Sequence, residues 1–219
     1  MLLNARKDIA QYGRKLHETG LIAGTGGNLS VRDSRSGRIA ISPSGMEHDA
    51  IRAADVPVLA ADGRLLCGTR RPSSELPMHL HVYRGRPDIN ALVHTHSRYA
   101  TALSCLRKAL PAVHYALGFA GPAVRCAPYA TYGSRTLADH ALRCMAGRKA
   151  VLLANHGVLA GGATLAEAFA VAQMVEFCAE VYCLAKAVGN PIPLPAREMR
   201  RVIEKLADYG QQPLSARRR

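Results

Sequence analysis

Apolar positions follow two different spacings along the first half of the chain, and each spacing predicts a kind of secondary structure. Residues 2–20 carry apolar side chains at helical intervals up to Gly20, which predicts an N-terminal helix. Short runs rich in β-branched residues predict strands at 38–42, 55–66 and 89–96. Before the last of these, serines followed by helical apolar spacing predict a helix that continues to about Tyr83.

The second half of the chain alternates in the same way. A buried apolar strand is expected at 150–157. Helices are expected in three places: up to Leu106, from a capping box of Thr164 and Glu167 to Gly189, and over 196–209. Helices and strands are interspersed, and the sequence shows no repeat and no Pro/Ser-rich linker. This pattern predicts one α/β layered domain that spans residues 1–219.

Composition narrows the class of protein. Apolar residues make up 48% of the chain, enough for a real core, and no uninterrupted apolar stretch reaches the roughly 18 residues of a membrane span. The six cysteines include no C-x-x-C pair, which favours buried, reduced thiols over a zinc ribbon. The expected protein is therefore cytoplasmic and makes no contact with a membrane.

The charge balance points to an anionic partner. The net charge is +13, but the basic residues are dispersed, except for the three arginines that end the chain. With 5% aromatic residues and no tryptophan, the chain offers no stacking platform for single-stranded nucleic acid. A phosphorylated small molecule is the favoured partner, nucleic acid is disfavoured, and residues 211–219 are expected to form a flexible basic tail.

Two pairs of histidines share one spacing but differ in context. His94 and His96 lie on a predicted strand, where residues i and i+2 face the same way, so both can reach one cation. His79 and His81 lie on a predicted helix, where the same spacing separates the side chains by about 200°. The strand pair is therefore a candidate metal site, with solvated or core histidines as the alternative, and the helix pair is not.

Two further residues could complete a ligand set. His156 lies in the turn that ends the segment predicted as a strand at 150–157, and it precedes Gly157, a position at the rim of a sheet. Glu75 stands at the start of the predicted helix that contains His79. Three histidines and a carboxylate suit Zn²⁺, although the spacing alone does not bring Glu75 and His156 to the strand pair.

Three loops of small residues offer hydroxyl and backbone N–H groups to an anion. "GTGGNLS" at 24–30 lacks the ending of a Walker loop and the third glycine of a dinucleotide fingerprint, so a helix end running into a turn is an equal alternative. "SPSG" at 42–45 and "PSSE" at 72–75 are the others, and the second stands at a helix N-terminus, which favours phosphate. Capping explains these serines equally well, yet a phosphate held there would lie beside Glu75.

The ordered motifs resemble one known family. "GTGGNLS", "ISPSGM", "RPSSE", "VHTHS", "HY" at 114–115, "CAPYATYG", "NHGVL" and "ADYG" are similar to the class II aldolase/adducin family, over about residues 5–210. The resemblance implies a three-layer α/β/α sandwich with a mainly antiparallel central sheet, a homotetramer with active sites between subunits, and one Zn²⁺ per subunit or another divalent metal. It implies cleavage of a ketose 1-phosphate, of the L-fuculose 1-phosphate type, to dihydroxyacetone phosphate and a short aldehyde.

The resemblance also assigns roles to residues. It implies that His94, His96, His156 and Glu75 are the metal ligands, with Glu75 also the catalytic acid/base, and that the phosphate is bound by Gly27, Asn28, Ser44, Gly45, Ser73 and Ser74. Tyr115 would reach a neighbouring subunit's site, and Tyr209 would close over the substrate. Ser42 and Ser44 stand where the family often has threonine, which keeps the hydroxyl group, while the differences in "ALGFAG" leave the aldehyde open.

Relatives that share this metal site carry out other reactions. The epimerases use an aspartate a few residues after the position of Tyr115, and residues 116–124 contain no acidic residue, which argues against that reaction. A sugar-phosphate dehydratase and a 3-oxo acid phosphate decarboxylase stay open as alternatives. A non-catalytic, adducin-like interaction domain is expected to have lost the ligand set, whereas all four candidate ligands are present.

Overall fold

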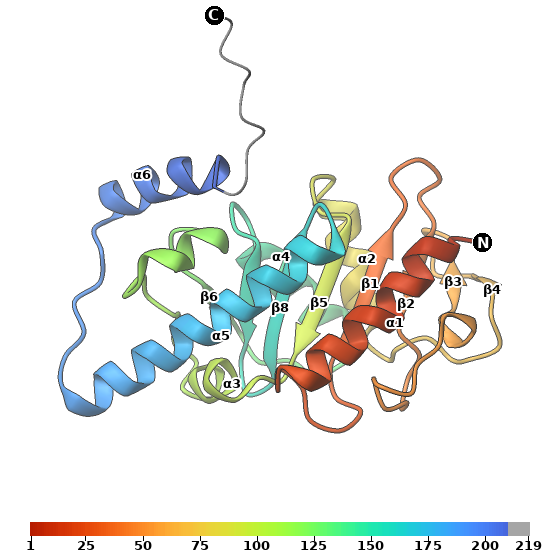
Figure 1. The fold of residues 1–219 in the computed structure, drawn as a ribbon, viewed down its shortest axis with the longest axis horizontal. Coiled ribbons are helices and arrows are strands. Elements are labelled where there is room, and N and C mark those ends of the chain that lie inside the picture. Colours follow the sequence, from red (N-terminus) through yellow and green to blue (C-terminus); the bar gives the residue numbers. More distant parts are fainter. Residues whose placement is uncertain (210–219) are drawn as a thin grey trace, which may run out of the picture.

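One mixed sheet of eight strands forms the centre of the molecule (Figure 1). The computed structural model describes residues 1–209, and the predicted tail at 211–219 lies outside this range. The strand order is β4-β3-β2-β1-β5-β8-β7-β6, and every neighbouring pair is antiparallel except β6 with β7. The strands are β1 (Asn28–Arg32), β2 (Ile39–Ile41), β3 (Val58–Leu59), β4 (Leu65–Cys67), β5 (Ala91–Thr95), β6 (Arg125–Ala127), β7 (Ala150–Leu153) and β8 (Gly157–Gly162).

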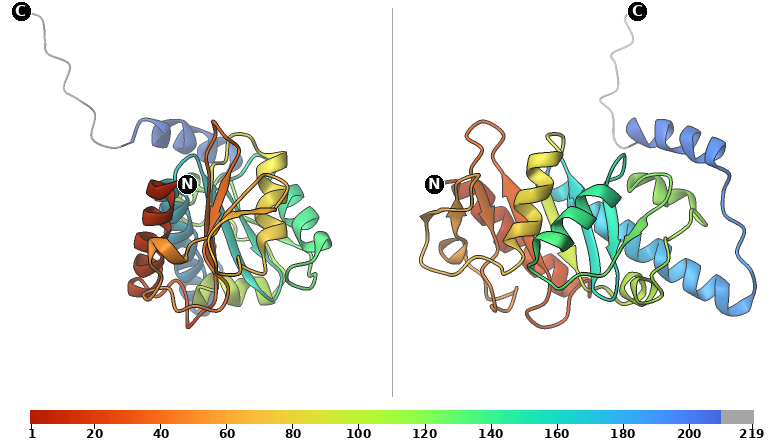
Figure 2. Two further views of the ribbon diagram at one scale, coloured as in Figure 1. Left: turned by 90° about the vertical axis from the view of Figure 1, so that its right-hand side faces the viewer. Right: turned by 180° about the vertical axis from the view of Figure 1, so that it is seen from behind.

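Helices cover both faces of this sheet (Figure 2). One face carries α1 (Leu3–Glu18), α3 (Arg98–Cys105) and α5 (Leu165–Val188). The other carries α2 (Leu76–Gly85) and α4 (Arg135–Cys144). The 3₁₀ helices η1 (Ala53–Asp55) and η2 (Tyr115–Phe119) lie in connections, and α6 (Ala196–Ala207) packs against η2. The predicted α/β/α sandwich with a mainly antiparallel sheet is confirmed.

Strand β5 runs through the middle of the core. The alternation of its side chains between the two faces of the sheet decides which way His94, near its end, points. Ala91 and Val93 pack in the cluster under α1 and α5, whereas Leu92 packs in the cluster under α2 and α4. Both faces are covered, so Ala91, Leu92 and Val93 are all apolar and do not alternate with polar residues. His94, two residues after Leu92, faces the same side as Leu92, which is the side of α2.

Helix α5 is the longest described helix and packs along the sheet. By length and composition it is also the one described helix that could cross a membrane, a test that the core helix of a soluble protein passes as well. Its buried residues, among them Phe169, Val175 and Cys178, belong to the main core cluster. Thr164 caps the N–H of Glu167, while the Glu167 carboxylate accepts from the N–H of Ala163.

Four elements differ from the sequence expectations. The glycine loop at 24–30 becomes strand at Asn28, and the elements β6, α4 and β8 were not predicted. Strand β8 is rich in glycine because its neighbours lie very close: a Cβ on Gly162 would stand 2.8 Å from the backbone nitrogen of Ala168 on α5. The glycine content of β8 therefore reflects close contact between helix and sheet. Because glycine has a low strand propensity, the sequence did not predict this strand.

Candidate metal centre and substrate pocket

The register of the sheet brings the candidate ligands to one edge. Strand β5 ends at Thr95, and its antiparallel neighbours β1 and β8 begin at the same edge, where Asn28 pairs with His94 and Val158 pairs with Thr95. His96 follows directly after β5, and His156 lies in the turn that joins β7 to β8. Residues far apart in the chain therefore meet because three neighbouring strands end or begin together.

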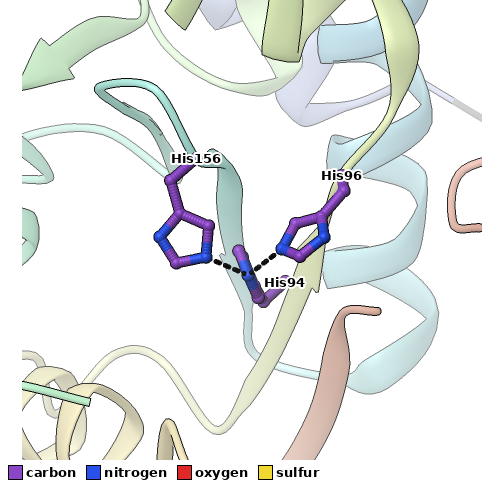
Figure 3. A group of neighbouring side chains, drawn as sticks. All are labelled: His94, His96 and His156. Atoms are coloured by element: carbon purple, nitrogen blue, oxygen red, sulfur yellow. Dashed lines mark hydrogen bonds between the residues drawn. The ribbon is translucent and has the colours of Figure 1, made fainter. Parts of the chain in front are cut away.

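The three predicted histidines form one cluster (Figure 3). The Nε2 atom of His94 lies 3.0 Å from Nε2 of His96 and 3.2 Å from Nε2 of His156. The ligand atoms of the three rings all lie within 4.8 Å of one another. His94 is buried, His156 is partly buried and His96 is exposed, so the cluster opens toward solvent on one side.

Glu75, the predicted carboxylate, closes the set from the other side. Its Oε2 atom is 3.0 Å from Nε2 of His94 and accepts a hydrogen bond of 3.0 Å from Nδ2 of Asn28. Its Oε1 atom lies 3.4 Å from Nε2 of His156 and is buried, with no hydrogen-bond partner among residues 1–209. Glu75 also occupies the N-cap position of α2, but its side chain makes no capping bond there because it points to the histidines.

The charges of the cluster are strongly coupled. Burial alone would raise the pKa of Glu75, but the nearby His94 and His156 and the Asn28 amide together hold it below its usual range. Burial, and then the positive charge of His94, lowers the pKa of His96 and of His156 to about 4. At neutral pH Glu75 is therefore a carboxylate and these two rings are neutral, the states in which such side chains bind a divalent cation.

The donor set fits a metal ion by its chemistry. Nδ1 of His94 lies 2.7 Å from the carbonyl oxygen of Val158, so its N–H donates there and Nε2 points to the cluster. A backbone partner of this kind fixes the tautomer and orientation of a ligating histidine. Three imidazole nitrogens, together with a buried carboxylate oxygen that lacks any other partner, form a set suited to Zn²⁺ or a related divalent metal.

A cavity of about 340 Å³ opens over the cluster. All six residues predicted to bind phosphate line it: Gly27, Asn28, Ser44, Gly45, Ser73 and Ser74. The Ser73 hydroxyl already accepts from the N–H of Glu75, and the Asn28 amide is occupied by Glu75 and His79. Backbone N–H groups and the exposed Ser44 and Ser74 hydroxyls are therefore the donors available to an anion.

The two predicted tyrosines lie elsewhere on the described chain. Neither Tyr115 nor Tyr209 lines the cavity, and both are exposed. Tyr115 begins η2, where its ring packs against His114, and Tyr209 follows α6, where its ring meets Phe119.

Sequence reasoning missed several residues of the site. Thr25, Tyr129, Tyr132 and Asn155 also line the cavity. The two tyrosines come from the loop after β6, a strand of three residues that gave no clear sequence signal. His79 was given no role, yet it is fully buried and bonded to Asn28. As predicted, His81 does not join it: His81 pairs with Asp139 on α4.

Comparison with known proteins decides the family. The model of the class II aldolase and adducin N-terminal domain matches residues 7–183. The chain belongs to this family. The resemblance read from the motifs is thereby confirmed, and the matched range includes every candidate metal ligand.

Relatives and solved structures of class II aldolase type agree along almost the whole chain. The chain is 50% identical over 212 residues to a 5-deoxy-D-ribulose 1-phosphate aldolase of Bacillus thuringiensis serovar kurstaki, covering 97% of this chain and 100% of the relative. It is 42% identical to a 5-methylthioribulose-1-phosphate/5-deoxyribulose-1-phosphate aldolase of Rhodospirillum rubrum, with coverage of 94% and 92%. A solved L-fuculose 1-phosphate aldolase superimposes with a TM-score of 0.91 at 49% identity, covering 93% and 96%.

Proposed function

We propose that this protein is a metal-dependent aldolase that cleaves a ketose 1-phosphate to dihydroxyacetone phosphate and a short aldehyde. The observation that carries the proposal is the Glu75 carboxylate facing three histidines on the floor of a cavity lined by glycine and serine loops. The aldolase names of relatives that match almost the full chain support it.

The metal would be held by His94, His96, His156 and Glu75, and we propose Zn²⁺, one per subunit. Three nitrogen donors and one oxygen donor suit Zn²⁺, and release of the carboxylate would leave three ligands and the open position that catalytic zinc sites have. When bound, such a cation acts as a Lewis acid that stabilises the negative charge left on the ketose after the C3–C4 bond breaks.

Glu75 is proposed to move the proton at the reacting carbon. Its Oε1 atom has no hydrogen-bond partner in the described chain, whereas Oε2 is held by Asn28 and His94. A carboxylate with one oxygen fixed and the other without a hydrogen-bond partner can take up and return a proton without losing its place. Burial next to the cavity floor limits competing exchange with bulk water.

The phosphate is proposed to bind at the loops of Gly27, Ser44, Gly45 and Ser74. Gly27 adopts a φ of 78°, and a Cβ there would lie 2.6 Å from the carbonyl oxygen of His94. Only glycine satisfies both conditions, so the loop can approach the cluster and direct N–H groups into the cavity. The substrate would thus span from these loops to the metal ligands.

The names of the relatives support the proposal that the substrate is a ketose 1-phosphate with a short, unphosphorylated end. One relative is named for 5-deoxyribulose 1-phosphate, another also for its methylthio analogue, and the solved structure for L-fuculose 1-phosphate. All three share the phosphate and carbonyl end and differ in the aldehyde they release. We propose that 5-deoxyribulose 1-phosphate, which would release acetaldehyde, is the preferred substrate, because that name belongs to a relative identical at half of the aligned positions.

We further propose a cytoplasmic homotetramer with active sites between subunits. Tyr115 and Tyr209 are 56% and 76% exposed and do not line the cavity of their own chain, which suits residues that act on a neighbouring subunit's site. The test is to mix inactive Tyr115→Phe and Glu75→Gln proteins after dissociation. Recovery of part of the activity supports shared sites, and no recovery from a reassembled mixture contradicts them.

The central experiment follows dihydroxyacetone phosphate with a coupled NADH assay. Zinc-loaded wild type and Glu75→Gln are each incubated with 5-deoxyribulose 1-phosphate, 5-methylthioribulose 1-phosphate and L-fuculose 1-phosphate. Release by the wild type, reduced at least about 100-fold in Glu75→Gln, is the expected result. Zinc binding without release from any substrate would refute the aldolase and leave the dehydratase and decarboxylase reactions to be assayed.

A further inference from the structure

A buried chain of hydrogen bonds runs from the interior to the Glu75 carboxylate. The Tyr83 hydroxyl lies 2.6 Å from Oγ of Ser30, and this Oγ lies 2.6 Å from Nδ1 of His79. Nε2 of His79 lies 2.5 Å from Oδ1 of Asn28, whose Nδ2 donates to Glu75 at 3.0 Å. Five residues from β1 and from the start and body of α2 are therefore connected in one line.

The direction of every bond in this line follows from the chemistry of its last member. A carboxylate only accepts, so the Asn28 amide must present its NH₂ group to Glu75 and its oxygen to His79. The amide oxygen also only accepts, so Nε2 of His79 carries the proton. The neutral ring then accepts at Nδ1 from the Ser30 hydroxyl, which in turn accepts from the Tyr83 hydroxyl.

Burial makes this order rigid. Ser30 and His79 are fully buried, and Tyr83 and Asn28 are 3% and 4% exposed, so water is not available to replace a missing partner. A flipped Asn28 amide would place its oxygen against the carboxylate and its NH₂ group against the N–H of His79. Both contacts would be repulsive in a setting of low dielectric, where an unpaired polar group is costly.

We propose that His79 is a positioning residue that acts through Asn28 on Glu75. The Nε2–H group of His79 donates to the Asn28 oxygen and fixes the orientation of the amide. The amide NH₂ group then holds Oε2 of Glu75, so that Oε1 faces the histidine cluster. The inference rests on the proposed metal role of Glu75. It does not depend on which ketose is cleaved or on whether cleavage takes place.

The chain offers a graded set of variants. His79→Leu removes the donor to Asn28, whereas His79→Gln keeps an N–H group that can reach the Asn28 oxygen. Ser30→Ala leaves His79 in place but removes the donor to its Nδ1 atom, so the bond to Asn28 alone is left to fix the tautomer of the ring. His81→Gln is the matched control, because His81 lies on the same helix and bonds Asp139.

Two measurements on the full-length protein test the inference. ¹⁵N–¹H spectra of the imidazole rings report the tautomer of His79, and competition with a chromophoric chelator reports the affinity for zinc. We expect the Nε2–H tautomer in the wild type and also in Ser30→Ala, because the Asn28 oxygen requires the proton on Nε2 in both proteins. Zinc affinity should fall about 10- to 100-fold in His79→Leu, and stay within about threefold of wild type in His79→Gln and His81→Gln.

Several outcomes would overturn the inference. An Nδ1–H tautomer of His79 in the wild type would contradict the inferred direction of the hydrogen bonds. Unchanged zinc affinity in a folded His79→Leu protein would show that His79 does not position Glu75. If His79→Leu does not fold, Ser30→Ala decides: retention of the Nε2–H tautomer without Ser30 supports the lock between His79 and Asn28, and an Nδ1–H ring contradicts it. Failure of the wild type to release dihydroxyacetone phosphate while it binds zinc refutes the proposed reaction alone, since neither readout here uses substrate.

Discussion

Replacing Gly157 with alanine should damage the site without removing any of its ligands. Gly157 begins β8, and a Cβ built on it would stand 2.2 Å from the carbonyl oxygen of Thr95 and 3.0 Å from Cδ2 of His96. Ordinary contacts of a Cβ begin at 3.4 Å. Because the nearest atom belongs to the backbone, β5 and β8 must separate by about 1.2 Å at the position where His94 and His96 are held.

The magnitude follows from that displacement. Overpacking against backbone in a filled core costs typically 1–3 kcal/mol, and this contact stands at the severe end, so about 3 kcal/mol is expected. For a chain of this length that corresponds to a fall in Tm of roughly 6–12 °C. A displacement of about 1 Å in a site can also cost about 100-fold in activity, and zinc affinity should fall with it.

A matched control lies on the same strand. A Cβ on Gly161 would meet only the ends of side chains, Cδ1 of Ile89 at 2.9 Å among them, and these can turn aside. Gly161→Ala should therefore cost less than about 1.5 kcal/mol and leave zinc affinity unchanged. Thermal unfolding and chelator competition measure both effects. A Gly157→Ala protein with wild-type Tm and zinc affinity would show that close approach of β5 and β8 does not shape the site.

Three further results are expected. Glu176→Gln should lower the free energy of unfolding by about 1–2 kcal/mol, because the Glu176 carboxylate accepts from the N–H groups of Tyr99 and Ala100 at the start of α3. Glu180→Gln is the control, and equal urea midpoints of the two variants would contradict this. Burial lowers the pKa of His48, so the folded protein binds fewer protons there than the unfolded chain. Stability should therefore fall as the pH drops below about 6.5 and fall less in His48→Asn, and parallel pH profiles would refute it. Removing zinc with a chelator should lower Tm by roughly 5–10 °C, measured against free zinc at about 100 times its Kd, where binding contributes about 2.7 kcal/mol; a Tm that does not respond to zinc would contradict a metal site.

Local patterns predicted most of the elements and the strand pair of histidines. The β5 run and its period of two predicted that His94 and His96 could meet, although β5 ends at Thr95 and His96 lies just beyond it. Glu75 could not be placed by spacing, because its approach depends on the packing of α2 over β1 and β5. Its residue type and its place at a helix start made Glu75 a candidate carboxylate, and the motif resemblance then implied that it is a ligand.

His79 shows where sequence reasoning stops. Its partners, Asn28 and Ser30, lie 51 and 49 positions away in the chain, and no local pattern connects residues at that distance. From the sequence alone, a histidine between apolar neighbours on a helix is expected to be a structural or an exposed residue. Strand β8 was missed for a related reason: Gly157 lies against the backbone of Thr95 and Gly162 lies against α5, and only the assembled fold shows these close contacts.

The residue at the N-terminus of α2 affects both the thermal stability of the helix and the proposed activity, and the two have different requirements. Glu75 holds the N-cap position, where Ser, Thr, Asp or Asn would normally bond a free N–H of the first turn, yet its side chain is turned away to the histidines. Selection for stability alone would favour a serine or aspartate at this position. Under the role proposed for Glu75, function takes precedence over helix stability at this position, and Glu75→Ser should yield a protein that withstands heat at least as well as the metal-free wild type while it no longer cleaves the substrate.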